Sequence, residues 1–214
     1  MLNDAAGGSP EARACFADRY QPLVRTYLAA RWRHSPMIEE LDDAVQDVFV
    51  ECLRAGGVLE RAEIDRPGGF RAFLYGLVRN IALRFEQQRA RRRVPADIDP
   101  DALAASEESL SRVFDRAWAT TLMREAATRQ AELAALAGPE AQQRVELLRL
   151  RFQDDLPVRE IARRWQADPA ILHRDYAKAR DEFRSALMEV LARYHPGAPT
   201  ALERECSDLL ALLR

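Results

Sequence analysis

Apolar residues recur every three or four positions along most of this chain, the spacing of one buried face of an α-helix. The first such stripe runs from Cys15 to Leu28, and further stripes follow at 41–53 and 70–81. Alternating runs of Val, Ile, Thr and Tyr between turn residues do not occur. The pattern therefore predicts an all-α protein.

The stripe at 41–53 leaves a polar, acidic face on the opposite side of its helix. At helical spacing the apolar positions are Leu41, Ala44, Val45, Val48, Phe49, Cys52 and Leu53. Asp43, Gln46 and Asp47 then project away from them. A face of this kind suits a basic protein partner.

The helix predicted at 70–81 continues into a basic end. Its core stripe comprises Phe70, Phe73, Leu74, Leu77, Val78 and Ile81. Phe70 and Phe73 are therefore interpreted as packing residues rather than platforms for stacking bases, whereas Tyr75 lies off the stripe and is not assigned. Arg79 projects away from the stripe, and the helix runs on into arginines that suit phosphate: Arg84, Arg89, Arg91, Arg92 and Arg93.

Charge is segregated along the chain although the net charge of its 214 residues is only −2. Five arginines and one glutamate occupy 84–93, and five acidic residues without a basic one occupy 97–108. A basic patch can therefore bind phosphate despite the slightly negative sum. Val94 and Pro95 break the basic helix, and 94–111 is predicted to be an acidic linker between two small helical domains, at 11–93 and 112–191.

A helix-turn-helix pattern lies in the second half. Val158, Ile161, Ala162 and Trp165 share one face of a short helix, and Asp168 and Pro169 are suited to the N-cap and first position of the next. The second helix is predicted to place Leu172, Tyr176, Ala179 and Phe183 inward and Ala170, Arg174, Lys178 and Asp181 outward. In this arrangement the second helix enters the DNA major groove.

A C-terminal tail helix is predicted within 192–214, where Thr200 and Glu203 form a capping-box pattern. Its apolar stripe comprises Leu202, Cys206, Leu209, Leu210 and Leu213. Such a stripe must be covered, either by packing back onto the second domain or by docking on a partner or on the first domain.

Neither the cysteines nor the histidines indicate a metal site or catalysis. Cys15, Cys52 and Cys206 are far apart, as are His34, His173 and His195, and Cys52 sits on a core stripe as a reduced thiol would. Phosphate loops, nucleophile elbows and paired-carboxylate arrangements do not occur. We therefore expect no enzyme activity, cofactor, metal or small-molecule substrate. Without a membrane-spanning run or signal peptide, a cytoplasmic protein is expected.

The two segments Glu39 to Phe49 and Phe70 to Ala82 together resemble the second conserved region of bacterial RNA polymerase sigma factors of the extracytoplasmic-function class. Order, spacing and residue types agree. The resemblance implies that core RNA polymerase binds Asp42, Asp43, Gln46 and Asp47. It also implies that Arg79, Asn80, Arg84, Arg89, Arg91, Arg92 and Arg93 hold the minus-ten promoter element.

The second half resembles the fourth region of the same class, with Glu160-Ile161-Ala162, a turn, a helix and Lys178-Ala179-Arg180 in order. This likeness assigns the minus-thirty-five element to Arg159, Arg163, His173, Arg174 and Lys178. The sequence departs from the family at Gln166, where glycine is usual, and at Asp175, where arginine is common. The block from Phe114 to Trp118, with the long insertion that follows it, resembles a divergent planctomycete-type subgroup.

The resemblance implies a subunit that binds core RNA polymerase and directs promoter recognition, DNA melting and transcription initiation. An anti-sigma factor is a further partner that such proteins can have. Two other interpretations stay open. One is a polymerase-independent helix-turn-helix regulator, which leaves the acidic face at Asp42 to Asp47 without a purpose. The other is a sigma-like adaptor or decoy that no longer reads DNA. Asp175 favours this interpretation, because DNA phosphates repel a carboxylate.

Overall fold

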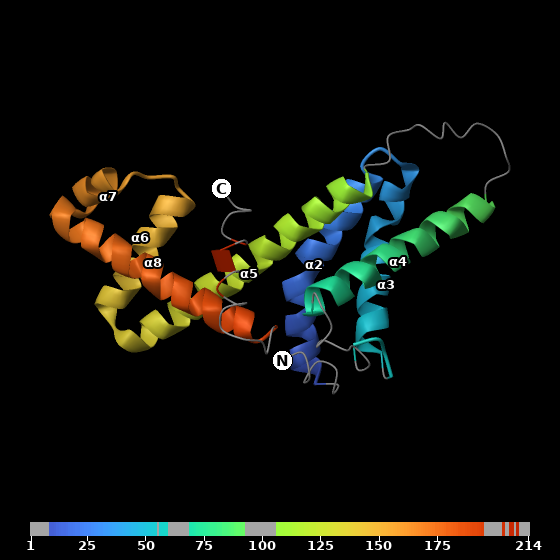
Figure 1. Cartoon of the computed structure of the whole chain (residues 1–214), viewed down its shortest axis with the longest axis horizontal. Helices are drawn as coiled ribbons and strands as arrows, with labels where there is room; N and C mark the ends of the chain where they lie inside the picture. The colour runs from blue at the N-terminus through green and yellow to red at the C-terminus, as the bar shows by residue number, and fades with distance from the viewer. Residues whose placement is uncertain are drawn as a thin grey trace. The chain divides into compact units, whose positions relative to one another are not determined.

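The structure, a computed structural model, describes residues 9–54, 56–59, 69–92, 106–194, 203, 206, 207 and 209. Across these residues it contains helices and no strand, so the all-α prediction is confirmed (Figure 1). The described residues divide into two compact units, one up to Thr121 and the other from Leu122. Each unit has its own buried core.

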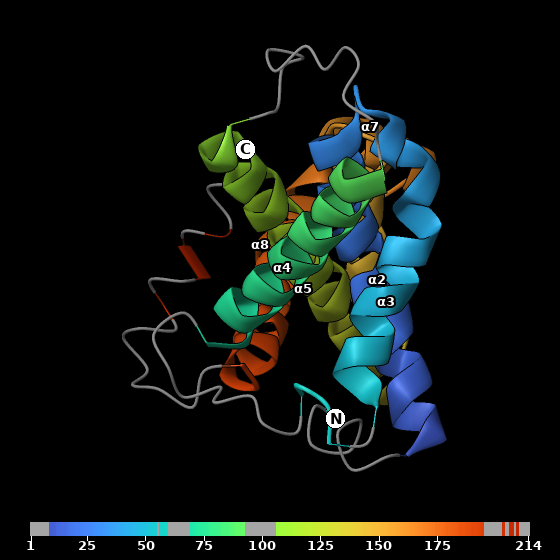
Figure 2. The same cartoon turned by 90° about the vertical axis from the view of Figure 1, so that its right-hand side faces the viewer.

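Unit 1 contains α2 (Pro10–Trp32), the 3-10 helix η1 (Pro36–Glu40), α3 (Leu41–Leu53), α4 (Gly69–Arg92) and the first half of α5 (Glu107–Ala137). Helix α2 begins at a cap in which the Ala12 amide donates to Ser9 Oγ at 3.3 Å, with Pro10 at the first helical position. Figure 2 shows α4 crossing the α2 and α3 pair, and α4 contacts both.

The core of unit 1 is rich in aromatic rings. The Tyr20 ring stacks on Trp118 of α5 with centroids 6.1 Å apart, and Phe70 of α4 lies 5.3 Å from Tyr20. Phe70 is fully buried, as expected of a packing residue, and Phe73 is half-buried beside it at 5.8 Å. Tyr75 is half-buried, and its ring meets Tyr27 and Phe114 edge-on. Tyr75, unassigned from the sequence, is therefore a packing residue as well.

Two glycines are required where helices end. Gly57 follows α3, and a Cβ there would lie 2.6 Å from the Arg54 carbonyl oxygen, too close for any side chain. Gly138 separates α5 from α6 (Pro139–Phe152) with φ at 104°, a conformation that other residues rarely adopt. Both turns thus depend on the absence of a side chain.

Unit 2 contains the second half of α5, α6, α7 (Val158–Trp165) and α8 (Pro169–Ala192). Its core joins α6, α7 and α8 through Leu147, Leu150, Val158, Ile161, Ala162 and Leu172. Gln130 of α5 is buried, and its Nε2 donates to the Ala179 carbonyl oxygen of α8 at 3.0 Å. Arg144 of α6, whose side chain is only 9% exposed, forms an ion pair of 2.7 Å with Glu182 of α8. Apolar packing and buried polar contacts together join the helices of this unit.

The unit boundary differs from the predicted domain boundary. Residues 107–111, expected in the linker, form the first turns of α5, and the helix begins at a cap in which the Ser109 amide donates to Ser106 Oγ at 3.1 Å. Leu110, Phe114 and Trp118 are buried in unit 1, although 112–191 was predicted to form the second domain. The apolar stripe of α5 therefore contributes to the core of unit 1 in its first half and to unit 2 in its second half. The break at Val94 and Pro95 lies outside the described residues.

Of the predicted tail helix, the structure describes Glu203, Cys206, Ser207 and Leu209, all helical. Cys206 and Leu209 are buried. Burial raises the pKa of the Cys206 thiol, while the nearby charge of Arg184 on α8 lowers it in part. These residues therefore favour packing of the tail onto unit 2. Leu202, Leu210 and Leu213 lie outside the described residues.

Candidate functional site

Helix α3 carries the predicted acidic face at the surface of unit 1. Leu41, Ala44, Val45, Val48 and Cys52 are buried, while Asp42, Asp43 and Gln46 are exposed and Asp47 is half-buried. Asp42 and Asp43 lie in the first turn of α3, where the helix dipole stabilises negative charge. Asp42 also forms an ion pair with Arg25 of α2. The structure thus brings together the predicted polymerase-binding residues on one helix.

Cys52, on the inner side of α3, is a buried thiol as predicted. Burial raises its pKa to about 12, with a further contribution from the charge of Glu51. The thiol therefore stays protonated and unreactive at neutral pH.

Ion pairs join the acidic face of α3 to the predicted DNA-binding arginines of α4. Arg84 Nη2 lies 3.0 Å from an Asp47 carboxylate oxygen, and Arg84 Nη1 lies 3.4 Å from Glu51. Arg89 lies 2.9 Å from Glu40, at the end of η1. The two helices were predicted to bind different partners, but here their charges face each other.

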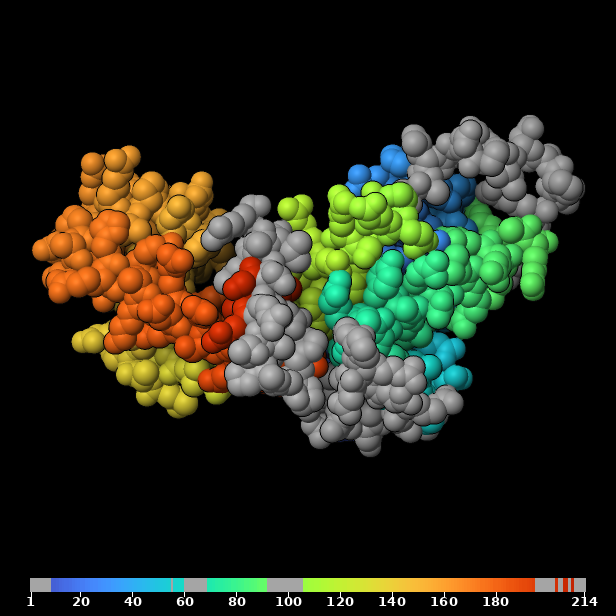
Figure 3. Space-filling view, in the orientation of Figure 1, coloured from blue at the N-terminus to red at the C-terminus, as the bar shows by residue number. Residues whose placement is uncertain are grey.

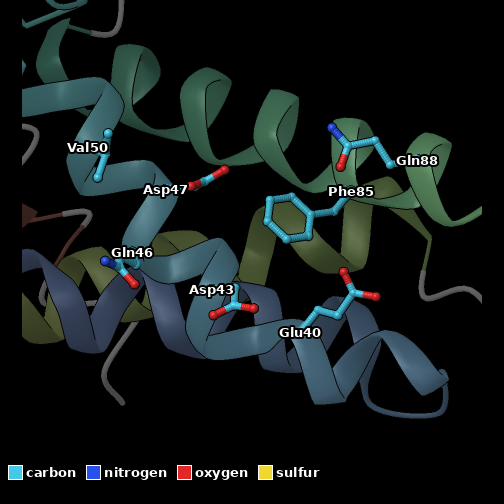
Figure 4. Close-up of a pocket in the computed structure, with 7 residues that line it drawn as sticks. All are labelled: Glu40, Asp43, Gln46, Asp47, Val50, Phe85 and Gln88. Carbon is cyan, nitrogen blue, oxygen red and sulfur yellow. The ribbon is translucent and has the colours of Figure 1, made fainter.

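A pocket of about 400 Å³ opens between α3 and α4, beside these ion pairs (Figure 4). Its acidic lining residues are Glu40, Asp43 and Asp47, and the ring of Phe85 lies between the Asp47 and Glu40 side chains. Gln46, Val50 and Gln88 complete the lining. Val50 is 53% exposed, so the pocket combines carboxylates with accessible apolar surface. Such a lining fits a basic side chain with an aliphatic stem.

Arg79, another predicted DNA-binding residue, is bound to the start of α5. Its Nε donates to Glu107 at 3.1 Å, and Arg31 of α2 reaches the other oxygen of Glu107 at 2.9 Å. The hydrogen bond from Arg31 is the largest effect on the pKa of Glu107 and lowers it. Burial partly opposes this effect, and the hydrogen bond from Arg79 lowers the pKa further. The hydrogen bond to Glu107 in turn raises the pKa of Arg79.

The cluster of Arg31, Arg79, Glu86 and Glu107 was not predicted from the sequence. Arg31 also binds Glu86 of α4 at 2.7 Å, and the Trp32 indole donates to the same carboxylate at 2.8 Å. Glu107 had been counted as a linker residue. A signal was present, because Glu107, Leu110, Phe114 and Trp118 are spaced as one helical face.

The remaining predicted residues of α4 are less constrained. Asn80 and Arg91 are exposed. Among the described residues, neither has an ion-pair or hydrogen-bond partner. The Arg92 side chain and Arg93 lie outside the described residues.

In unit 2, α7 and α8 form a helix-turn-helix. Helix α7 ends at Gln166 in the left-handed conformation, with φ at 51°. The Ala167 amide donates to the Ala162 carbonyl at 3.0 Å and the Gln166 amide to Arg163 at 3.2 Å, the two bonds of a Schellman cap. Asp168 then caps α8 by accepting from the Ala170 amide at 2.7 Å. Glutamine thus occupies the left-handed position that favours glycine, so the departure noted in the sequence falls at the cap of α7.

The outer face of α8 agrees with its prediction. Leu172 and Ala179 are buried, Tyr176 and Phe183 are half-buried, and the outward positions are all exposed: Ala170, Arg174, Lys178 and Asp181. Helices α7 and α8 are the orange segments of unit 2 in Figure 3.

The predicted DNA-binding residues of α7 and α8 are exposed as well. These are Arg159, Arg163, His173, Arg174 and Lys178. Arg163 lies 3.3 Å from Glu160 on its own helix. Within the described part of the chain, the other four have no ion-pair partner. This cationic surface is therefore available to an external anion, unlike Arg79, Arg84 and Arg89 of α4.

Asp175 is less exposed than the outward positions of α8. It is half-buried. The Arg144 guanidinium has a raised pKa, first through its hydrogen bonds to Glu182 and further through the charges of Glu182 and Asp175. Asp175 thus contributes to the internal charge network of unit 2.

The described residues include no group of three or more His, Cys, Asp or Glu side chains placed to hold a metal ion. Among the described helices, none is both long and apolar enough to cross a lipid bilayer. Comparisons with protein-family models, with curated proteins and with solved structures found no match to this chain. The functional argument therefore rests on the surfaces described above.

Proposed function

We propose that this protein is a dissociable promoter-specificity subunit of bacterial RNA polymerase, similar to sigma factors of the extracytoplasmic-function class and acting in the cytoplasm. The observation that carries the proposal is the separation of two charged surfaces. The exposed acidic face of α3 belongs to unit 1. Arg174 and Lys178, which have no ion-pair partner among the described residues, belong to unit 2. A protein that must hold a basic protein and a DNA element at once needs both.

The acidic face of α3 would dock on a basic surface of core polymerase. Asp43 and Gln46 are exposed and border the pocket beside α4, which could receive a lysine or arginine side chain of the polymerase. Charge complementarity of this kind mainly steers the encounter and fixes the orientation of the partners. Asp42 and Asp47 are paired with Arg25 and Arg84 in the free chain. On docking they would bind basic residues of the polymerase instead.

The arginines of α4 would hold the minus-ten element by a similar exchange. An exposed ion pair contributes little to stability because water and salt screen it, so the phosphates of melted DNA can compete for Arg84 and Arg79. Asn80 and Arg91 are accessible without any exchange. Taking a base out of the stack costs a few kcal/mol, and phosphate contacts along α4 would help to offset that cost.

A second candidate function is a sigma-like adaptor that binds polymerase or an anti-sigma factor without reading DNA. The specific observation in its favour is that Arg79, Arg84 and Arg89 are all paired with carboxylates of this chain. A polymerase-independent regulator is less favoured, because it gives no purpose to the acidic surface of α3.

Polymerase binding by charge-reversed variants tests the proposal. Asp43→Lys should weaken binding to purified core RNA polymerase by at least tenfold, because the central carboxylate of the acidic face becomes a cation. The matched control is Asp18→Lys, a reversal at an exposed position of α2 in the same unit. Equal binding by Asp43→Lys and the unmodified chain would refute the assigned surface. Failure of the unmodified chain to bind polymerase would refute the proposed function itself.

A further inference from the structure

An exposed isoleucine lies beside the cations of α8. Ile171, in the first turn of the helix, is 50% exposed. Ile171, Arg174 and Lys178 are spaced at i, i+3 and i+7, so they form one stripe along the helix. One apolar group and two positive charges, without an ion-pair partner in the described part of the chain, thus share a surface.

The neighbours of this stripe leave the α8 backbone accessible. Ala170 and Ala177 are exposed on the same side of α8, and both side chains are small. Asp181, also exposed, places a carboxylate about two turns beyond Arg174. The two small alanines therefore favour close approach of an anionic partner to the first turns of α8. The carboxylate of Asp181 disfavours contact with the turns that follow.

Duplex DNA is the partner whose chemistry matches this stripe. The major groove admits an α-helix and offers the 5-methyl group of thymine to apolar side chains and the O6 and N7 of guanine to arginine. In a helix-turn-helix, the N-terminal residues of the second helix contact base edges. A single exposed apolar residue is common on protein surfaces, but here it occupies the position where a base-reading side chain is needed.

We propose that Ile171 is a specificity-determining residue that contacts a thymine 5-methyl group, with Arg174 bound to a guanine and Lys178 to phosphate. The inference rests on the proposed function, because it takes α8 as the helix that enters the groove. Ile171 and Arg174 are separated by about 4.5 Å along the helix axis. This rise is comparable to the step of about 3.4 Å between base pairs, so the thymine and the guanine lie on neighbouring base pairs.

The test begins with selection of preferred duplex sequences from a random pool by the full chain, alone and with core RNA polymerase. Each thymine of the selected site is then replaced by deoxyuridine, which lacks only the 5-methyl group. For the unmodified chain, one such replacement should weaken binding about fourfold, the effect of one buried methyl group. Ile171→Ala should bind the thymine and deoxyuridine duplexes equally, and Ile171→Val should keep most of the discrimination.

Two further variants provide a control for Ile171 and a test of the guanine contact. Leu136→Ala removes another exposed apolar side chain of unit 2, 87% exposed on α5, and should discriminate thymine from deoxyuridine as the unmodified chain does. Arg174→Gln should relax the preference at the adjacent guanine by tenfold or more, about the contribution of one bidentate pair.

The possible failures are distinguishable. If every deoxyuridine replacement affects the unmodified chain and Ile171→Ala alike, the role of Ile171 is overturned while the DNA-binding role of α8 stands. If the chain enriches no duplex sequence in either form, the DNA-binding function assigned to unit 2 fails, and the inference fails with it.

Discussion

Arg84 of α4 and Asp47 of α3 form an ion pair of 3.0 Å, although the sequence assigns them to opposite partners. Arg84 was predicted to bind promoter DNA and Asp47 to bind polymerase. Their pairing means that each predicted surface partly neutralises the other in the free chain. Under the proposed function, binding of polymerase to Asp47 would release Arg84 for DNA, so the two binding events would favour each other.

The first prediction tests this coupling through Asp47→Asn. The substitution removes one of the two carboxylate charges that pair with Arg84, leaves the other at Glu51, and keeps the shape of the side chain. Affinity for single-stranded DNA should rise a few-fold in the absence of polymerase, as measured by fluorescence anisotropy at low salt. The control is Asp18→Asn on α2. Unchanged DNA affinity in Asp47→Asn would contradict the coupling.

The second prediction concerns pH and the Glu107 cluster. Because the folded state lowers the pKa of Glu107 from 4.5, its stabilising contribution is fully present above pH 4.5 and is lost as the pH falls through the lowered value. Acidification should therefore release Arg79 and weaken the contact of Arg31 with Glu107, while Arg31 keeps its separate contact with Glu86. The NMR signals of their guanidinium groups should shift over this window, which lies below pH 4.5.

Glu107→Gln provides the comparison for that titration. The variant lacks the charge, so the guanidinium shift should disappear and affinity for single-stranded DNA at neutral pH should rise through release of Arg79. Glu108→Gln is the matched control, because Glu108 is the next residue and pairs with Arg112 on its own helix. A shift that persists in Glu107→Gln would assign the effect to another carboxylate.

The third prediction concerns the turn of the helix-turn-helix. Gln166 adopts φ at 51°, which costs a side-chain-bearing residue energy that glycine avoids. Gln166→Gly should raise the free energy of unfolding of unit 2 by up to about 1 kcal/mol, as measured by urea denaturation followed by circular dichroism. The same substitution at Gln143, exposed within α6, should lower it by about 1 kcal/mol. Loss of stability in both variants would contradict the role of the turn.

The fourth prediction concerns the assignment of Lys178 to phosphate. Lys178→Gln should weaken duplex binding similarly for all sequences and reduce the slope of log affinity against log salt by about one. The control is Arg124→Gln, a neutralisation at an exposed position on α5. If Lys178→Gln changed the sequence preference but not the salt slope, Lys178 would contact a base edge.

Much of the fold follows from the apolar spacing. The inward positions Phe70, Leu74, Val78 and Leu172 are buried as predicted, because burial of a stripe of such residues is the main favourable term in folding. The cap at Asp168 was likewise predicted from its residue type. These features depend on residues that are neighbours in the sequence, so the sequence alone is sufficient to predict them.

Features that depend on how helices cross were not predicted. The pairing of Arg84 with Asp47 needs the packing of α4 on α3, and the position of Asp175 toward Arg144 needs the packing of α8 on α6. The place of Trp118 in unit 1 likewise depends on which core its helix covers. Residue types and spacing define the face of a helix, but not which other element it meets.

Run-off transcription on a library of genomic fragments, with core RNA polymerase in the presence and absence of this protein, tests the central claim most directly. The proposed function predicts new start sites that depend on the protein and share two spaced sequence motifs. Binding to core polymerase without any new start site would contradict promoter recognition and favour the adaptor. Absence of both start sites and polymerase binding would contradict the assignment as a polymerase subunit.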